Sequence, residues 1–504
     1  MVYNKHEWQD GELITSGKLN HMELGIQLAD KQVSVKDYGA VGDGVADDTK
    51  SFIDAFSENK GTKVIIPTGT YLITKQVSIF GDVEFQNAKV ISTNNSQDYM
   101  FNVDGLDEIN IIGFKYNNDN GRGAIKISNT KTVRLTSFDI SGYSAETAYH
   151  KTDSALMLDN NTTIYLDDIK VHDHGFQYGA ELEHLNRCIS IQGDKTKTVI
   201  ARGLQFSKAN QGLVLSTPNG NVIVSDSSID NTTDNSMYLL ACLTFMATNV
   251  RFDDYYDESV IMGSGDYSFT NCWFSNVPNK VFGINNDTVG LSIIGCNIIQ
   301  SDKYSGQIVS FRDVNYTLNT FIFESNRIVT APDSTNNDIF HLGQINLFSI
   351  KNNTIKTFSI SDGRNMFAFR NSDSNAPYTG VIKDNYVMPI TKDVVIGTYY
   401  FARLYKEVGK VEISDNYISN GRMPMDNASV IYNGQKFFTR LGYVIDRTTR
   451  QSLYATTIPT KGRFNIGDVV YNTDPSNGVF AWVRMTTGLN NVSGVDWKTV
   501  SVNW

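Results

Sequence analysis

The sequence predicts an all-β fold, a right-handed single-stranded parallel β-helix, and two observations carry this prediction. The first is an eight-residue unit that recurs from Val83 to Ile418, with apolar residues at positions one, three and eight and usually a turn-former at position five. Its shortest returns lie about 22–24 residues apart, within the period of parallel β-solenoids. The apolar residues alternate in short runs, which favours strands over helices. Each unit is therefore expected to form part of one coil.

The second observation is position six of the unit, whose residues change in character along the chain. They are, in order, Ala88, Phe114, Phe138, Ile169, Leu204, Ser227, Val250, Cys272, Cys296, Asn326, Asn353, Asn385 and Asn416. If coils stack about 4.8 Å apart, this column becomes a continuous internal ladder. The four successive asparagines fit such a ladder because their amides can hydrogen-bond to one another and to the turn backbone.

Composition limits the classes of partner. The net charge of −10 argues against a nucleic acid, which needs a basic face, and weakly against an anionic membrane surface. The N-terminus lacks the apolar stretch of a standard secretion signal, and no apolar run is long enough to span a bilayer. We therefore expect no nucleic-acid partner, no membrane partner and no secretion by a standard signal.

The four cysteines are Cys188, Cys242, Cys272 and Cys296, and none has metal-ligand spacing. Cys272 and Cys296 fall in adjacent coils of the position-six column, close enough in principle to form a disulfide. We prefer to interpret them as small buried thiols of a chain folded in a reducing cytoplasm. No metal or cofactor is predicted.

Three parts are expected along the chain. Residues 1–31 form a head, residues 32–422 form the β-helix with a capping helix at its N-terminal end, and residues 423–504 form a small β module. In the head, Thr15 or Ser16 can cap a short helix with three apolar residues on one face, Leu19, Met22 and Ile26. A helix this short needs a partner, which is a symmetry mate, a larger assembly or the solenoid itself.

A glycine-rich loop and a second helix precede the first coil. Residues 33–56 read VSVKDYGAVGDGVADDTKSFIDAF, in which Asp47 or Asp48 can cap a helix with three inward residues, Phe52, Ala55 and Phe56. VIIPTGTYLI then starts the first coil. YGAxGDGxxDDT, a helix and IPxGxY form a long ordered signature. It resembles the start of the pectate-lyase superfamily (pectin-lyase-like solenoids), which occurs in phage tailspikes, polysaccharide depolymerases and related glycosidases.

The resemblance extends to both ends of the chain. It implies that Asp47 and Asp48 cap a helix that plugs the open end of the solenoid, where the first coil otherwise exposes an unpaired edge. The head, WxxGExITxxKLNxMExGI, resembles the N-termini of tail or preneck appendage proteins of phages that infect Gram-positive bacteria. Residues 461–497 resemble a small β module that closes many phage tail proteins. Its aromatic residues either stack on sugar or, as we prefer, form its core: Phe480, Trp482 and Trp497.

In functional terms the resemblance implies a phage tailspike that binds and depolymerises a host surface polymer, an exopolysaccharide, capsule or teichoic acid. Glycoside hydrolysis by paired carboxylates is the expected reaction. A homotrimer on the virion tail or appendage is also implied, joined to tail or neck proteins through residues 1–31, with the C-terminal module for trimerisation or carbohydrate binding. The alternatives are a lectin-like receptor-binding spike without activity, a polysaccharide lyase, which often uses Ca²⁺, and a teichoic-acid phosphodiesterase. The fold follows from this resemblance more firmly than the reaction does.

Two adjacent coils carry long insertions just after position eight, at residues 141–153 and 172–186. Because both emerge at the same phase, they are expected to stack on one side of the solenoid. They contain candidate substrate-binding residues and reserve candidates for the catalytic acid: His174, Tyr178 and Glu181 for binding, and Glu183 and then Asp173 for catalysis. A metal site in the His172-Asp173-His174 run is disfavoured, because adjacent strand residues point to opposite faces.

The coils that follow expose a phased column five residues past position eight: Gln211, Asp234, Asp257, Asn279 and Lys303. Two aspartates in one phase of neighbouring coils have backbones about 4.8 Å apart. This spacing suits the roughly 5–5.5 Å carboxyl separation of a retaining glycosidase, and the close like charges raise one pKa. We predict Asp234 and Asp257 as the catalytic pair, with three substrate-binding neighbours, Gln211, Tyr238 and Glu258. The alternative is that each aspartate closes a turn by bonding to its own backbone.

Overall fold

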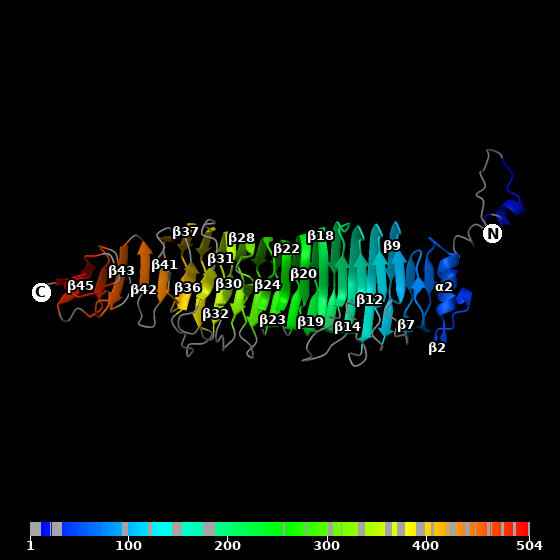
Figure 1. Cartoon of the computed structure of the whole chain (residues 1–504), viewed down its shortest axis with the longest axis horizontal. Helices are drawn as coiled ribbons and strands as arrows, with labels where there is room; N and C mark the ends of the chain where they lie inside the picture. The colour runs from blue at the N-terminus through cyan, green and yellow to red at the C-terminus, as the bar shows by residue number, and fades with distance from the viewer. Residues whose placement is uncertain are drawn as a thin grey trace.

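The structure is a computed structural model of the 504-residue chain, and Figure 1 shows an elongated solenoid with the chain termini at its two ends. No helix among the residues it describes is long and apolar enough to cross a membrane. The described residues are 12–20, 22, 33–92, 99–118, 123–143, 154–174, 187–255, 258–277, 280–300, 306–313, 315–330, 338–357, 365–369, 378–389, 399–404, 408–419, 421–422, 430–433, 435–438, 444–448, 450–460, 464, 466–474, 478–486 and 490–501.

Each full coil contributes to three parallel sheets, which we call A, B and C. Sheet A holds positions one to four of the repeat, and sheet B follows it directly. Strands β12, β14, β18, β20 and β22 bend around a corner and belong to two sheets each. Because every strand stacks on its equivalent in the next coil, the predicted parallel β-helix is confirmed.

Sheet A contains β1 (Val33–Ser34), β3 (Val64–Ile66), β6 (Val83–Phe85), β9 (Glu108–Ile112), β12 (Thr132–Tyr143), β14 (Thr163–His174), β16 (Thr198–Arg202), β18 (Gln211–Ser225), β20 (Met237–Thr248), β22 (Glu258–Thr270), β25 (Thr288–Ile294), β28 (Thr317–Glu324), β31 (Gln344–Lys351), β34 (Tyr378–Lys383), β37 (Val408–Ser414) and β40 (Val430–Asn433). Sheet B contains β2 (Asp43–Asp47), β4 (Gly69–Leu72), β7 (Ala88–Ser92), β10 (Lys115–Asn118), the second halves of β12 and β14, β17 (Gln205–Ala209), β19 (Ser228–Thr232), β21 (Arg251–Tyr255), β23 (Trp273–Val277), β26 (Asn297–Gln300), β29 (Arg327–Val329), β32 (Thr354–Thr357), β35 (Tyr386–Pro389), β38 (Tyr417–Ser419) and β41 (Gln435–Phe438). Sheet C contains β5 (Val77–Ser78), β8 (Phe101–Asp104), β11 (Ile125–Ser128), β13 (Ser154–Asp159), β15 (Arg187–Gln192), the first halves of β18, β20 and β22, β24 (Lys280–Ile284), β27 (Val309–Phe311), β30 (Phe340–Leu342), β33 (Asn365–Phe369), β36 (Tyr399–Leu404) and β39 (Gly421–Arg422).

The corner between sheets A and B has the same backbone conformation in every predicted repeat. Position five has a φ between 49° and 76°, the left-handed region that Gly, Asn and Asp tolerate best. The residues are Asn87, Gly113, Ser137, Asp168, Gly203, Asp226, Asn249, Asn271, Gly295, Ser325, Asn352, Asp384 and Asp415. The turn-former predicted at this position is therefore a left-handed residue that redirects the chain.

The position-six column lies inside the solenoid, as predicted, and every described member is buried. Its asparagines form a continuous hydrogen-bonded ladder. Asn353 Nδ2 donates to Asn385 Oδ1 at 2.8 Å and to the Phe323 carbonyl at 2.8 Å, and Asn326 Nδ2 donates to Asn353 Oδ1 at 3.0 Å. Each Oδ1 also accepts the backbone N–H of the position-six residue one coil earlier, which is Cys296 for Asn326, so these amides are satisfied without water.

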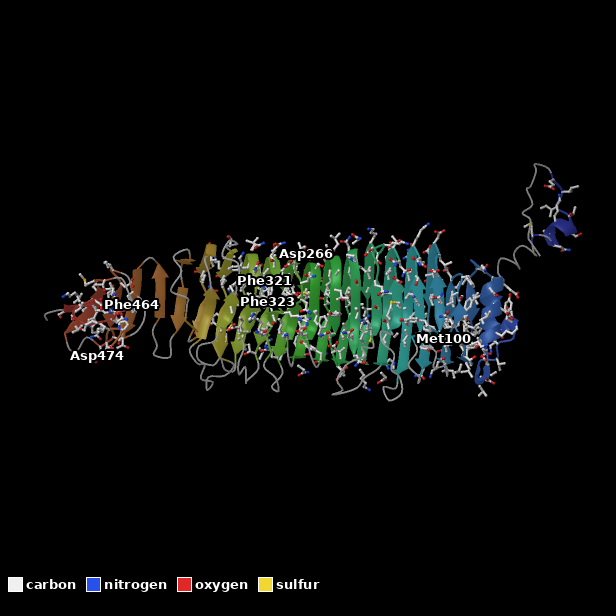
Figure 2. The ribbon with its side chains drawn as sticks, viewed as in Figure 1. Met100, Asp266, Phe321, Phe323, Phe464 and Asp474 are labelled. Atoms are coloured by element: carbon white, nitrogen blue, oxygen red, sulfur yellow. The ribbon has the colours of Figure 1, made fainter. Side chains whose placement is uncertain are left out.

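The same column continues toward the N-terminal end as two thiols and then apolar side chains. All four cysteines are free and buried, as expected of small buried thiols. The Cys296 sulfur accepts the backbone N–H of Cys272 at 3.4 Å. Aromatic rings fill the interior elsewhere, and Figure 2 shows two of them, Phe321 and Phe323, within the solenoid.

The N-terminal end is closed by the 3₁₀-helix η1 (Val35–Tyr38) and the helix α2 (Thr49–Glu58), drawn in blue in Figure 1. Phe52, Ala55 and Phe56 are buried, as predicted. The two aspartates divide the expected capping role. Asp47 accepts the Thr49 N–H at 3.0 Å, whereas Asp48 holds the glycine loop by accepting the N–H groups of residues 41 and 42. In the head, residues 16–20 are helical, and the Thr15 hydroxyl accepts the Lys18 N–H at 3.3 Å.

Parallel pairing continues beyond Ile418, the last residue of the predicted repeat, through β40 and β41. The octapeptide of this extra coil, VIYNGQKF from Val430 to Phe437, has apolar residues at positions one, three and eight and a glycine at position five, so the predicted repeat ended one coil too early. Antiparallel pairing begins with β42 (Val444–Thr448) and β43 (Arg450–Ala455), and β44 (Val469–Asn472), β45 (Val479–Arg484) and β46 (Trp497–Ser501) follow. Their separate core includes Phe464, labelled in Figure 2, with Trp482 and Trp497, whereas Phe480 is exposed.

Candidate functional site

The predicted insertions lie between the last strand of sheet B and the first strand of sheet C in their coils. This segment varies greatly in length: residues 175–186 separate β14 from β15, whereas residue 210 alone separates β17 from β18. Four of the predicted site residues, Asp257, Glu183, Glu181 and Tyr178, lie outside the described residues, as does the side chain of His174.

Asp234 and Gln211 lie at a short corner between sheets B and C. Gln211 Nε2 donates to Asp234 Oδ2 at 2.6 Å, and Arg187 Nε donates to Gln211 Oε1 at 3.3 Å. Gln211 is buried, and Asp234 is partly exposed. At this corner, hydrogen bonds therefore connect Arg187, Gln211 and Asp234, and Asp234 lies on the solvent side.

Glu258 and Tyr238 lie on the strands that follow. Glu258 is buried and forms an ion pair with Lys280, its register partner on β24. Tyr238 is partly exposed, and its charge interaction with Arg187 opposes the burial that lowers the pKa of that guanidinium group. Gln211 and Glu258 thus have partners within the protein, which indicates that they support this corner from inside.

Asp173, predicted as a reserve acid, lies on the outer face of sheet B. Its carboxylate contacts His172 Nδ1 at 2.8 Å and Lys208 Nζ at 3.1 Å, and His172 Nε2 contacts Asp139 Oδ1 at 3.0 Å. The hydrogen bond from His172 and then the contact with Lys208 outweigh burial and lower the pKa of Asp173. An ionised carboxylate is a poor proton donor, so this geometry suits a positioning role better than the acid role.

A pair of aspartates that we did not predict lies two and three coils further along the same face. Asp230 on β19 and Asp253 on β21 are direct register partners, one strand spacing apart. Arg251 donates to Asp253 Oδ2 at 2.6 Å, and Ser275 and Asn276 donate to its Oδ1 at 2.8 Å and 2.7 Å. In contrast, Asp230 Oδ1 is buried without a hydrogen-bond partner among the described residues.

These environments move the two acidities in opposite directions. Burial raises the pKa of Asp230, and the neighbouring Asp253 charge adds to this effect while Arg251 opposes it. Burial also disfavours the charged form of Asp253, but the hydrogen bonds from Arg251, Ser275 and Asn276 together lower its pKa. One carboxyl is thus held closer to its protonated form and its neighbour is held ionised, which is the division of roles that acid–base chemistry uses.

Asp230 lines a shallow depression on the outer face of sheet B, with a volume of about 330 Å³. Its walls are mostly polar and come from three coils: Lys170, His172, Gln205, Phe206, Ser207, Ser228 and Asp230. No group of three or more potential metal ligands occurs among the described residues. The depression therefore offers a carboxyl group with a raised pKa, together with other hydrogen-bonding groups, to a polar ligand.

The sequence contained a signal for this pair. One residue past position eight, rather than five, the repeat reads Asn117, Ser141, His172, Ser207, Asp230, Asp253 and Ser275. This phase stays on the strand and points outward, whereas the phase five residues past position eight falls in a corner of variable length. Counting along the strand would have identified the two in-register aspartates.

Residues 32–238 match the model of a family described as rhamnogalacturonase A/epimerase, pectate lyase-like. The tailspike protein of the E. coli bacteriophage HK620, solved with a pentasaccharide, is similar in structure, with a TM-score of 0.61 at 12% identity over 94% of this chain and 93% of that chain. The Streptococcus pneumoniae surface adhesin PfbA gives a TM-score of 0.44 at 14% identity, over 94% and 99% of the two chains. None of the curated proteins matches the chain in sequence. The predicted resemblance to the pectate-lyase superfamily is thus borne out over residues 32–238, and the tailspike likeness shows a shared fold.

Proposed function

We propose that this parallel β-helix, whose residues 32–238 are pectate lyase-like, binds and cleaves a polysaccharide by glycoside hydrolysis. The observation that carries the proposal is the Asp230–Asp253 pair, in register on adjacent strands with pKa values displaced in opposite directions. Asp230 is the proton donor to the glycosidic oxygen, and Asp253 is the carboxylate that acts at the anomeric carbon or on a water molecule.

The spacing of the pair favours one of the two hydrolytic routes. Adjacent strands lie about 4.8 Å apart, close to the roughly 5–5.5 Å carboxyl separation of retaining glycosidases. On that route Asp253 attacks the anomeric carbon while Asp230 gives its proton to the departing sugar, and Asp230 then takes a proton from the water that releases the product. The arginine that contacts Asp253 keeps it ionised for the attack.

The biological setting of the proposal is a phage tailspike that degrades a surface polymer of its host. The pectate lyase-like match of residues 32–238 and the fold shared with a tailspike support this setting. Within it, the head attaches the spike to tail or neck proteins and three chains assemble in parallel. A spike that binds its receptor without cleaving it would use the same face, and the experiment below separates the two.

The test uses four single variants of the full chain and a panel of bacterial surface polysaccharides. Asp230→Asn and Asp253→Asn are each expected to lower the rate of fragment release at least about 100-fold, because each removes an acid–base or nucleophilic role. Asp167→Asn, an exposed aspartate on sheet A, is the matched control and should retain the rate. The proportion of retained anomer in the first product, measured by NMR, tests the route.

Asp234→Asn tests the predicted pair Asp234 and Asp257 on the same samples. If Asp234 only accepts the hydrogen bond from Gln211, its asparagine variant keeps an acceptor oxygen and most of the activity. Loss of cleavage in Asp234→Asn with full activity in Asp230→Asn would move the catalytic site to the corner. Binding without fragment release by the unmodified protein would favour the non-enzymatic spike.

A further inference from the structure

The outer face of sheet B carries a second row of side chains at position seven of the repeat. Register pairing aligns these residues strand by strand along the solenoid, from the coil of the carboxylate pair toward the C-terminal end. They are Arg251, Trp273, Asn297, Arg327, Thr354, Tyr386 and Tyr417, and we call them the outer row. The row begins at Arg251, which contacts Asp253, so it is continuous with the proposed site.

Two places in the outer row expose aromatic rings. Trp273 is 41% exposed and is the register partner of Arg251. Tyr386 is also 41% exposed, and its ring lies against that of Tyr417 with centroids 4.2 Å apart and planes 12° apart. Exposed aromatic rings at two points of one polar row are not explained by packing alone, since inward positions already fill the core.

Tyr417 covers only one side of the Tyr386 ring. On the other side the next member of the row is Thr354, whose side chain is too small to cover a phenol ring. The 41% exposed tyrosine thus offers part of its aromatic ring beside the polar Thr354, a combination that suits the apolar face and the hydroxyl groups of a sugar ring. Between the two aromatic places, Asn297, Arg327 and Thr354 are all at least partly exposed and can form hydrogen bonds.

We propose that the outer row is a binding lane for a single polysaccharide chain that lies along the solenoid axis and rests on two aromatic stations, Trp273 and Tyr386. Trp273 holds the sugars next to the carboxylate pair, and Tyr386 holds the same chain four strand spacings, or about 19 Å, further along. This inference rests on the proposed function, because it takes the polymer cleaved at Asp230 and Asp253 as its ligand.

The lane makes affinity depend on chain length. A fragment too short to reach both stations binds at one of them, whereas a chain that spans about 19 Å gains the second contact without a second loss of translational freedom. We expect long fragments to bind at least about tenfold more tightly than short ones.

The test measures dissociation constants in the cleavage-deficient Asp230→Asn protein, by calorimetry and by quenching of tryptophan fluorescence. The probes are dextran, polygalacturonate and teichoic acid, each as long chains and as short fragments. For the probe that binds, Tyr386→Ala is expected to remove the advantage of long chains, and Tyr386→Phe, which keeps the ring, is expected to preserve it. Tyr165→Ala, at a partly exposed position on sheet A, is the matched control and should keep the advantage.

The possible failures are distinct. The lane would be overturned, and the proposed function left in place, if the Asp230→Asn protein bound long and short chains with equal affinity. The same holds if Tyr386→Ala left the length dependence unchanged. Two further outcomes would count against ring stacking. The first is that Tyr386→Ala loses the length dependence and also melts at a much lower temperature. The second is that a stable Tyr386→Phe protein loses the length dependence. Failure of every probe to bind the parent protein would contradict the proposed function itself.

Discussion

Asp230 and Asp253 are the same residue type on adjacent strands, yet their pKa values are displaced in opposite directions. Both are outward residues of sheet B at the same phase, so strand geometry does not separate them. The difference comes from their partners. Asp253 accepts three side-chain hydrogen bonds, whereas one oxygen of Asp230 is buried without any among the described residues. Part of this difference is local, because Arg251 lies two residues before Asp253, and part comes from Ser275 and Asn276 of the next coil, which a single octapeptide does not show.

The displaced acidities make opposite predictions for stability. The raised pKa of Asp230 means that the folded protein binds more protons than the unfolded chain between the ordinary and the raised value, so this residue's contribution to stability falls as pH rises through that interval. Asp230→Asn removes the penalty and is expected to raise the melting temperature at neutral pH, with the gain disappearing below the ordinary aspartate pKa.

The lowered pKa of Asp253 has the reverse consequence, because its stabilising contribution is present above the ordinary aspartate pKa and is lost as pH falls through the lowered value. Asp253→Asn is therefore expected to lower the melting temperature at neutral pH. Thermal unfolding of both variants across a pH series checks the two signs. Shifts of the same sign at neutral pH would contradict the assigned environments.

At the scale of the element, the octapeptide could be predicted well because one pattern meets two independent requirements, one on burial and one on backbone conformation. Apolar residues at positions one, three and eight must face inward, and position five must adopt a left-handed conformation, so both signals recur together. The corner between sheets B and C carries no such constraint, and its length changes from coil to coil. Site prediction from that corner was weaker for the same physical reason.

The asparagine ladder gives a stability prediction. Asn353→Leu removes the Oδ1 that accepts the backbone N–H and the Nδ2 of the buried Asn326, and it removes the Nδ2 that donates to Asn385 Oδ1, at a cost of roughly 1–3 kcal/mol. Asn319→Leu, at an exposed strand position of β28, is the matched control and should change stability much less. Denaturant unfolding followed by circular dichroism compares the two, and equal losses would mean that the ladder is not a source of stability.

At the scale of the whole molecule, the outer face of sheet A carries an apolar strip. Ile200, Ile223 and Met246 are direct register neighbours, and each is more than a third exposed. Such a strip on a monomer exposes apolar surface that a second copy can cover. We predict a parallel homotrimer, with light scattering at about three times the chain mass of 56.2 kDa.

A charge introduced into the strip tests whether this face makes the contact. Ile223→Lys is expected to shift the protein toward single chains, since burying an unpaired ammonium group is strongly unfavourable. Lys126→Ala, on sheet C, provides a control on another face. A native mass near one chain for the unmodified protein would contradict the trimer.

The number of coils and the length of the loops can change independently, because the corner between sheets A and B is constant and the corner between sheets B and C is variable. Because the left-handed turn is the same in every repeat, gain or loss of a whole coil changes the length of the rod by about 4.8 Å and leaves the neighbouring turns as they were. Residues added between β14 and β15, or between β29 and β30, leave the coil count unchanged. The length of the solenoid and the loops along one side of it can thus be altered by independent changes in the gene.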